Sequence, residues 1–197
     1  MPEPRTILQA LKEETRALHT ETEGAVRLME PDFSRAEYQR YLEQLHGLHA
    51  PLEEALSERL ADRFPAFALE QRTRRALLEQ DLRALGHDDA SLARLPRLSP
   101  LPELPTASEA LGVLYVLEGS TLGGQLLLRH LRKHFEGQEV GPFAYLRGHG
   151  EETGRMWKAF GEAMLDAVAT KGAEPARIIE GAKAGFRAFQ RGLRGAL

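Results

Sequence analysis

The sequence contains no cysteine and few β-branched aliphatic residues, with five valines and three isoleucines among 197 residues. Without cysteine the chain forms no disulfide and has no thiolate for catalysis or for binding zinc or an iron–sulfur cluster. A metal in this protein must therefore be held by histidine or carboxylate groups. Because valine and isoleucine favour strands, whereas the abundant leucine, alanine, glutamate and arginine favour helices, the composition predicts an all-α fold.

A strong charge of one sign is also missing. The net charge of −3 is mild, and a nucleic-acid binder would need a concentrated basic surface, so we expect no nucleic-acid partner. The N-terminus alternates polar and apolar residues, which shows no secretory signal and predicts a cytoplasmic protein. The length predicts one domain over residues 1–197, long enough to bury a core or enclose a ligand-sized cavity.

One apolar stretch, ALGVLYVLEGSTLGGQLLL at residues 110–128, has the pattern of a helix yet contains four glycines. Each glycine weakens a helix by about 1 kcal/mol relative to alanine. Gly112, Gly119 and Gly123 are seven and four residues apart, so they share one face, and with the small Ser120 they leave a strip of bare backbone. Such a strip lets a flat partner approach closely, although helix packing is the plainer interpretation of a GxxxG pattern.

The same stretch is nearly long enough to cross a membrane. Glu118 lies at its centre, where a carboxylate costs about 2.5 to 3.5 kcal/mol in a bilayer. We therefore expect no membrane span.

Periodicity and capping patterns predict the other elements. A first helix covers residues 6–24, and S-x-x-E and T-x-x-E capping boxes at Ser34 and Thr106 open the second helix and the glycine-bearing helix. Pro51 removes a backbone donor and should kink or break the second helix near Gly47. Further helices are predicted at residues 70–85, 106–135, 151–170 and from Pro175 onward, with a proline-rich connector at 87–105 and a glycine-rich loop at 136–150.

Four polar residues form a stripe on the first helix. Lys12, Arg16, His19 and Glu23 follow at intervals of four, three and four residues, which places them on one face. A solvated face of charge pairs is the plain interpretation. However, His19 follows Leu18 at the edge of the apolar face, where its ring could point into a cleft with the cations at its mouth.

Other histidines suggest metal chemistry only in part. Glu43 and His46 form an E-x-x-H, but a di-iron site needs this motif on two helices, and the chain has no second one. His130 and His134 are four residues apart without the glutamate of H-E-x-x-H, so we interpret them as surface residues.

Taken together, LKEETRALHTETE at residues 11–23 and LYVLEGSTLGGQ at 114–125 resemble the heme oxygenase family, particularly its bacterial, biliverdin-producing members. The resemblance extends through LLEQDLRALG at 77–86, MWKAF at 156–160 and the aromatic C-terminal helix. It implies an all-α, single-domain helical bundle with heme b between a proximal and a glycine-rich distal helix. The implied reaction is oxidative cleavage of heme, as both cofactor and substrate, to biliverdin, carbon monoxide and ferrous iron.

On the proximal side, the resemblance assigns His19 as the ligand of heme iron. Glu23 matches the carboxylate that accepts the other ring N–H and so fixes the orientation of the ligand. Lys12 matches a position that pairs with a heme propionate, and Arg16 stands where larger members carry another basic residue.

On the distal side, Gly119, Gly123 and Gly124 match the glycines that lie over the other heme face. Ser120 stands where many members, including the animal enzymes, carry an aspartate that organises a water network, whereas bacterial relatives also have serine. His49 matches a distal histidine of such a network in some bacterial members.

The last helix and one lysine complete the implied site. Phe186 matches an aromatic residue that lines the pocket, and Phe189 replaces a propionate-binding tyrosine of some relatives. Lys158 is our candidate for that second propionate contact.

The resemblance also implies partners. O₂ is consumed, and because no flavin or nucleotide motif is visible, electrons come from an external donor of the ferredoxin or flavin reductase type. A bilin-accepting photoreceptor is a candidate product acceptor. Three alternatives stay open: a heme carrier or sensor without turnover, a di-iron oxygenase on the same fold, and a plain interaction bundle.

Overall fold

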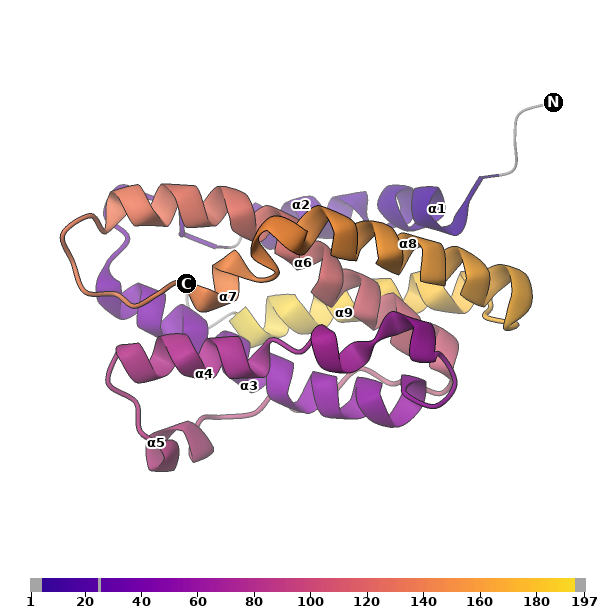
Figure 1. The fold of residues 1–197 in the computed structure, drawn as a ribbon, viewed down its shortest axis with the longest axis horizontal. Coiled ribbons are helices and arrows are strands. Elements are labelled where there is room, and N and C mark those ends of the chain that lie inside the picture. Colours follow the sequence, from indigo (N-terminus) through magenta and orange to yellow (C-terminus); the bar gives the residue numbers. More distant parts are fainter. Residues whose placement is uncertain (1–4, 25, 194–197) are drawn as a thin grey trace.

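The computed structural model describes residues 5–24 and 26–193, and these two ranges contain helices and no strand. Figure 1 shows their arrangement. The α-helices are α1 (Ile7–Glu14), α2 (Arg16–Gly24), α3 (Arg35–Leu60), α4 (Arg75–Ala84), α5 (Asp89–Ala93), α6 (Ala107–His134), α7 (Ala144–Arg147), α8 (Thr153–Thr170) and α9 (Pro175–Leu193). Three 3-10 turns accompany them: Pro65–Phe67, Leu69–Gln71 and Gly150–Glu152. The prediction of an all-α fold is confirmed.

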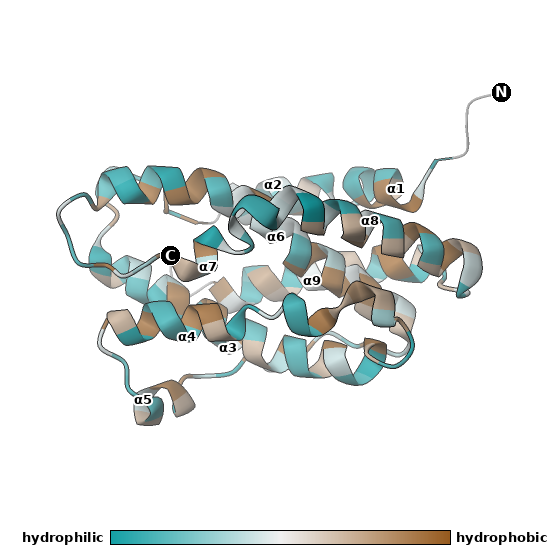
Figure 2. Ribbon diagram, viewed as in Figure 1, coloured by the Kyte–Doolittle hydropathy of each residue, from teal (hydrophilic) through white to brown (hydrophobic). Residues whose placement is uncertain are grey.

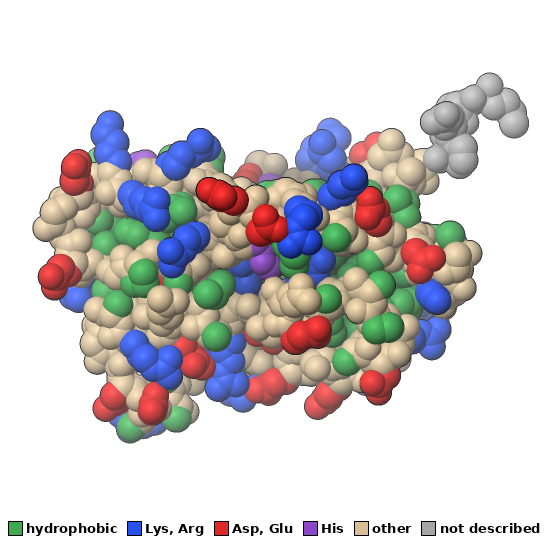
Figure 3. Space-filling view, viewed as in Figure 1, with side chains coloured by type: hydrophobic (Ala, Val, Ile, Leu, Met, Phe, Trp, Pro, Cys, Tyr) green, Lys and Arg blue, Asp and Glu red, His purple; other side chains and the backbone are tan. Residues whose placement is uncertain are grey.

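The packing is centred on α6 and α9, which make the most extensive helix contact in the described chain. α3 and α4 lie along one side of this pair, and α1, α2 and α8 lie along the other (Figure 1). In Figure 2 hydrophobic and hydrophilic residues alternate along the helices, as expected of helices that bury one face. Acidic and basic side chains are intermixed on the face shown in Figure 3, as the mild net charge of −3 predicts.

Helix α6 is long and apolar enough, by length and composition, to cross a membrane. Its most apolar window is 56% buried inside the fold, where it packs against α9, α7, α3 and α8. Glu118 within it is buried and paired with Arg72. We therefore interpret α6 as the core helix of the bundle.

The first helix differs from its prediction. Residues 6–24 form two helices, because α1 ends at Glu14 and α2 begins at Arg16. The Thr15 hydroxyl donates a hydrogen bond to the Leu11 carbonyl at 2.7 Å, a side-chain bond that competes with regular helix geometry.

The predicted helix starts are confirmed where capping chemistry marks them. Ser34 with Glu37 and Thr106 with Glu109 form complete capping boxes at the starts of α3 and α6. Pro175 is the first residue of α9, where a missing backbone N–H costs nothing.

Of the kink or break predicted at Pro51, the break is wrong, because α3 runs unbroken from Arg35 to Leu60. Proline leaves the carbonyl four residues earlier, that of Gly47, without its helical donor. The Leu98 N–H fills this position and donates to the Gly47 carbonyl at 2.8 Å. A Cβ on Gly47 would lie 2.1 Å from the Pro96 carbonyl oxygen, so the glycine is what lets the connector approach.

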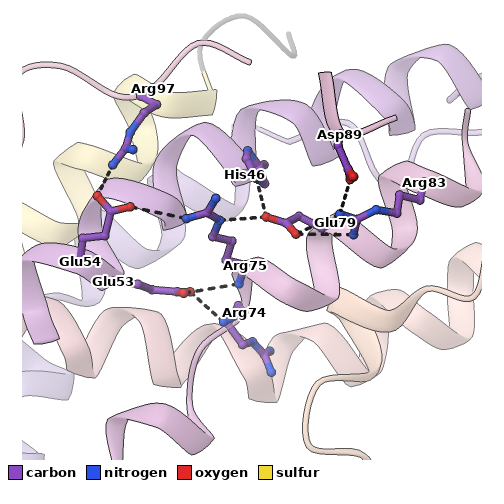
Figure 4. A network of polar contacts seen from close by, with 9 residues as sticks. All are labelled: His46, Glu53, Glu54, Arg74, Arg75, Glu79, Arg83, Asp89 and Arg97. Atoms are coloured by element: carbon purple, nitrogen blue, oxygen red, sulfur yellow. Dashed lines mark hydrogen bonds and ion pairs between the residues drawn. The ribbon is translucent and has the colours of Figure 1, made fainter. Parts of the chain in front are cut away.

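The proline-rich connector has more structure than predicted. It contains α5, whose N-terminus is capped by the Asp88 side chain. Figure 4 shows the ion pairs that fix this region: Arg83 with Asp89 at 3.0 Å, and Arg97 with Glu54. The helix predicted at residues 70–85 is α4, and it starts later than predicted, at Arg75, because residues 69–71 form a 3-10 turn.

The glycine-rich segment 136–150 also contains an unpredicted helix, α7. Its first turn is held from α4, because Asp81 accepts hydrogen bonds from the Ala144 and Tyr145 amides at 2.7 and 2.9 Å.

His130 and His134 are less exposed than the prediction of surface residues implies. Both are partly buried, their rings stack 5.8 Å apart, and the distance from His134 Nε2 to the Phe33 carbonyl oxygen is 2.6 Å.

Candidate functional site

His19 lies on α2, a helix without buried residues, and its side chain is 55% exposed. Its Nδ1 lies 3.3 Å from Glu23 Oε2, one turn along the helix. The opposite ring nitrogen, Nε2, makes no hydrogen bond within the described residues. A carboxylate at Nδ1 favours the tautomer whose Nε2 is free to bind a metal. The arrangement is that of an imidazole prepared for one external ligand bond.

Lys12 lies on α1, and Arg16 is the first residue of α2, three residues before His19. Both side chains are exposed, and neither has an ion-pair partner among residues 5–24 and 26–193. Arg16 also lines an open hollow of about 730 Å³, which is bordered by α1 and α2 alone. Two unneutralised cations beside an available imidazole suit a ligand that carries carboxylates at its edge.

Two aromatic residues of α9 connect the surroundings of His19 with the interior. Phe186 meets the His19 ring edge-on, with centroids 5.7 Å apart. Three residues further along, Phe189 meets the buried His49 ring at 6.0 Å. Helix α9 therefore contacts both histidines of the predicted site, His19 through Phe186 and His49 through Phe189.

The glycines of α6 fall into two groups. A Cβ on Gly112 would lie 2.0 Å from the Ile178 carbonyl oxygen, and one on Gly124 would lie 2.9 Å from that of Leu146. On Gly119 it would make an ordinary contact at 3.9 Å with Trp157, and on Gly123 it would meet nothing within 4 Å. Packing therefore explains Gly112 and Gly124, whereas the fold itself has no steric need for glycine at 119 or 123.

A buried polar group lies behind this part of α6. His49 is 0% exposed, with Nδ1 at 3.0 Å from Glu53 and Nε2 at 3.1 Å from the Tyr145 hydroxyl. Burial raises the pKa of Tyr145, while the nearby Arg74 and a hydrogen bond with Ser120 lower it. Ser120 itself donates to the Leu117 carbonyl at 2.7 Å. The described chain thus joins His49 to Glu53 of its own helix and to Tyr145 of α7.

Glu118, next to Gly119, forms a buried ion pair with Arg72. Burial raises the pKa of Glu118, and the charges of Arg72 and Arg74 lower it. His149 Nε2 lies 3.6 Å from Glu118 Oε1, and its pKa is lowered by burial and by the same two arginines. Side-chain contacts of Arg72 and His149 with Glu118 therefore fix the middle of α6.

Other predicted residues lie apart from these groups. Lys158 is on α8, 79% exposed, with Nζ at 3.8 Å from Glu162. The E-x-x-H residues have separate partners, since His46 Nε2 lies 3.5 Å from Glu79 and Glu43 lies 2.9 Å from His87. No group of three or more potential metal ligands occurs in the described part of the chain.

Sequence reasoning missed the polar residues that join distant elements: Arg72, Arg74, Asp81, Tyr145 and His149. For Asp81 a signal existed, because it interrupts the apolar stripe of Leu78 and Leu82 on α4, which Leu85 continues at the C-cap. The two arginines lie at or before the start of α4, where the sequence offers no comparable pattern.

Comparison with known proteins gives a consistent result. The family model described as "Heme oxygenase" matches residues 5–194. A heme oxygenase from Xanthomonas campestris is 34% identical over 154 residues, which cover 77% of this chain and 86% of the relative.

Solved structures are similar over nearly the whole chain. The NO- and CO-bound heme oxygenase from Neisseria meningitidis is 26% identical with a TM-score of 0.78, covering 98% of this chain and 92% of that one. Heme oxygenase from Leptospira interrogans is 18% identical with a TM-score of 0.70, covering 96% of this chain and 99% of that one. Heme oxygenase-1 from Synechocystis, in complex with heme, is 16% identical with a TM-score of 0.67, covering 96% and 93%. These last two show a shared fold.

Proposed function

This chain belongs to the heme oxygenase family and is an enzyme of heme degradation, and from that premise we propose that His19 is its iron ligand and α6 its distal wall. The proposed reaction opens heme to biliverdin and releases carbon monoxide and ferrous iron. When bound, heme supplies both the iron at which O₂ is activated and the porphyrin that is opened.

The residues around α2 fit such a ligand. The observation that carries the proposal is the exposed His19 imidazole with Glu23 at Nδ1, at 3.3 Å, beside cations that have no ion-pair partner in the described chain. His19 Nε2 would hold the iron, and Lys12 and Arg16 would hold propionates. Phe186, edge-on to His19 at 5.7 Å, would restrict rotation of the imidazole ring.

The distal glycines fit a flat ligand for a complementary reason. At Gly119 and Gly123 a side chain would enter open space or touch only Trp157, so these positions keep backbone exposed without any gain in packing. We propose that they let the α6 backbone approach the distal face of heme. Gly124 contributes indirectly, because it admits the Leu146 backbone and so sets the position of α7 against α6.

Ser120 and His49 are the proposed proton-handling residues of the distal side. The Ser120 hydroxyl hydrogen-bonds to the Leu117 carbonyl at 2.7 Å, so it stays beside the exposed backbone of Gly119. His49 is joined to Glu53 and to Tyr145 by its two ring nitrogens. A buried imidazole held at both nitrogens can release or take up a proton without changing its orientation.

The remaining partners are also proposals. A separate donor of the ferredoxin or flavin reductase type would supply electrons, and a photoreceptor is a candidate bilin acceptor. Lys158 as a second propionate contact and a cytoplasmic location stay predictions.

A hemin titration tests the site assignment. Hemin is added to wild-type protein, to His19→Ala and to His130→Ala, which changes a histidine outside the proposed site, and the Soret band is followed. Reductant and air are then supplied, and the pigment formed is identified by chromatography. We expect wild type and His130→Ala to bind hemin and form biliverdin, and His19→Ala to lose the ligand spectrum and turnover.

Each alternative gives a different outcome. A carrier or sensor keeps its Soret band under reductant and air, and a di-iron protein retains iron without heme. An interaction bundle gives no Soret change at all. Unchanged spectra and turnover in His19→Ala would remove His19 as the ligand.

A further inference from the structure

Asp81 is a fully buried carboxylate on α4, with 0% of its surface exposed. Its Oδ1 accepts a hydrogen bond from the Ala144 N–H at 2.7 Å, and its Oδ2 accepts one from the Tyr145 N–H at 2.9 Å. A buried carboxylate is costly unless it is hydrogen-bonded. Both carboxylate oxygens of Asp81 therefore accept hydrogen bonds from the first two amides of α7.

Helix α7 needs this support because it has none of its own. It is four residues long, and its N-cap residue Phe143 is in the left-handed region, at φ +54°, with no side-chain cap. The first amides of a helix lack partners within it and favour a negative charge nearby. Asp81 supplies both the acceptor and the charge from an element 63 residues earlier.

Helix α7 in turn places the Tyr145 hydroxyl beside His49. Tyr145 is buried, and its ring meets the His49 ring edge-on at 5.4 Å while the Arg74 guanidinium lies 5.4 Å from the centre of its ring. Its hydroxyl lies 3.1 Å from His49 Nε2. The next two residues also contact α6, since Gly124 packs on the Leu146 backbone and the Gln125 side chain donates to the Arg147 carbonyl at 2.8 Å.

We infer that Asp81 is a positioning residue for heme cleavage: by holding the first two amides of α7 it keeps the Tyr145 hydroxyl at His49 Nε2. This inference rests on the proposed distal role of His49. A phenol hydroxyl donates one hydrogen bond and accepts another. Together with the Glu53 carboxylate, the Tyr145 hydroxyl holds both nitrogens of the His49 ring, so the orientation of this imidazole depends on the phenol.

The test uses Asp81→Asn and Tyr145→Phe in the complete protein. Asparagine retains one acceptor oxygen but turns an NH₂ group toward the second amide. In heme-free protein we expect deuterium exchange at residues 144–147 to be about tenfold faster in Asp81→Asn. In Tyr145→Phe we expect exchange at these amides to stay near the wild-type rate, because Asp81 still holds them.

Turnover is then compared in the heme-loaded protein. Both variants should slow bilin formation about tenfold, with a larger solvent deuterium isotope effect, while hemin affinity stays within about twofold of wild type. The double variant should be no slower than Tyr145→Phe, because both changes remove the same hydrogen-bond link.

Tyr38→Phe is the matched control. Tyr38 is also a buried tyrosine, it contacts the ring of Phe143 beside α7, and its hydroxyl has no hydrogen-bond partner in the described chain. We expect it to keep wild-type turnover and isotope effect. If Asp81→Asn does not fold, Tyr145→Phe and Tyr38→Phe still decide whether the hydroxyl matters.

Two results would overturn the inference: wild-type exchange at residues 144–147 in Asp81→Asn, or wild-type turnover in Tyr145→Phe. A failure of the proposed site itself is distinguishable, because hemin binding and turnover would then survive His19→Ala, whatever the exchange rates show.

Discussion

Helix α6 is held in two different ways along its length. Near its start, at Gly112, it is held by backbone: a Cβ there would lie 2.0 Å from the Ile178 carbonyl oxygen and 2.4 Å from the Ala182 nitrogen of α9. Near its middle it is held by side chains, through the buried pair of Glu118 with Arg72. Two glycines of the same helix face therefore have different explanations. Packing against α9 requires Gly112, whereas no packing contact requires Gly123.

This difference indicates what the middle of α6 is for. A helix fixed by its neighbours' backbones has no free surface at the contact, whereas one fixed by a buried ion pair keeps its glycine strip available. The cost is the desolvation of two charges, which packed apolar residues would avoid. Changes at the two regions should thus separate stability from catalysis.

The largest effect is expected from Glu118→Leu. Removing the carboxylate leaves Arg72 buried and uncompensated, and we expect the free energy of unfolding to fall by about 4 kcal/mol. Urea denaturation followed by circular dichroism measures the change. Adding Arg72→Met should restore part of the loss, because an apolar pair replaces the ion pair, while the Phe67 and Met156 carbonyls lose their Arg72 donor. If the double variant is as unstable as Glu118→Leu, the ion pair is not the support of this region.

Gly112→Ala should have the next largest effect. The added methyl group meets backbone atoms that cannot rotate away, so α6 and α9 must separate, at a cost of about 3 kcal/mol. Gly154→Ala in α8 is the matched control, because a Cβ there meets nothing within 4 Å. Equal denaturation midpoints for the two variants would contradict a backbone contact at Gly112.

Gly123→Ala should change stability slightly and in the opposite direction. Since the site has room for a Cβ, alanine should stabilise the heme-free protein by up to about 1 kcal/mol through its helix propensity. The same methyl group should disturb the heme face and slow bilin formation by about tenfold or more. A variant that is less stable, or as active as wild type, would place Gly123 with Gly112 as a packing residue.

Features that depend only on neighbouring residues could be predicted from the sequence. The starts of α3, α6 and α9 follow from Ser34, Thr106 and Pro175, because each acts within its own turn. The His19 and Glu23 pair, one turn apart, was predictable for the same reason. Pro51 misled because its effect depends on Leu98, whose N–H takes the freed Gly47 carbonyl from outside the helix.

The buried polar contacts beside the middle of α6 were the least predictable part of the candidate site. Tyr145 meets His49 across 96 residues, and Arg72 meets Glu118 across 46. Helix α7 itself depends on Asp81, so no local pattern predicts it. Glycines likewise look alike in sequence, and only the neighbouring backbone distinguishes Gly112 from Gly123.

The smallest expected effect is the loss of stability at mildly acidic pH. The pKa of His149 is lowered by burial and by Arg74 and Arg72, and that of His46 mainly by burial. A histidine whose folded pKa lies below its unfolded value stabilises the fold fully above about pH 6.5, and this contribution is lost as the pH falls toward the folded pKa.

We therefore expect the free energy of unfolding to fall as the pH decreases from about 6.5 to about 5.5, before the carboxylates titrate. His149 lies beside Glu118 in the middle of α6, so His149→Gln should flatten this slope, whereas His130→Gln, near the end of the same helix, should leave it unchanged. Urea midpoints measured across the range give both slopes. Because acid weakens the side-chain support and not the backbone contact, hydrogen exchange should rise first around Glu118 and last around Gly112; the reverse order would mean that the two regions of α6 are not held differently.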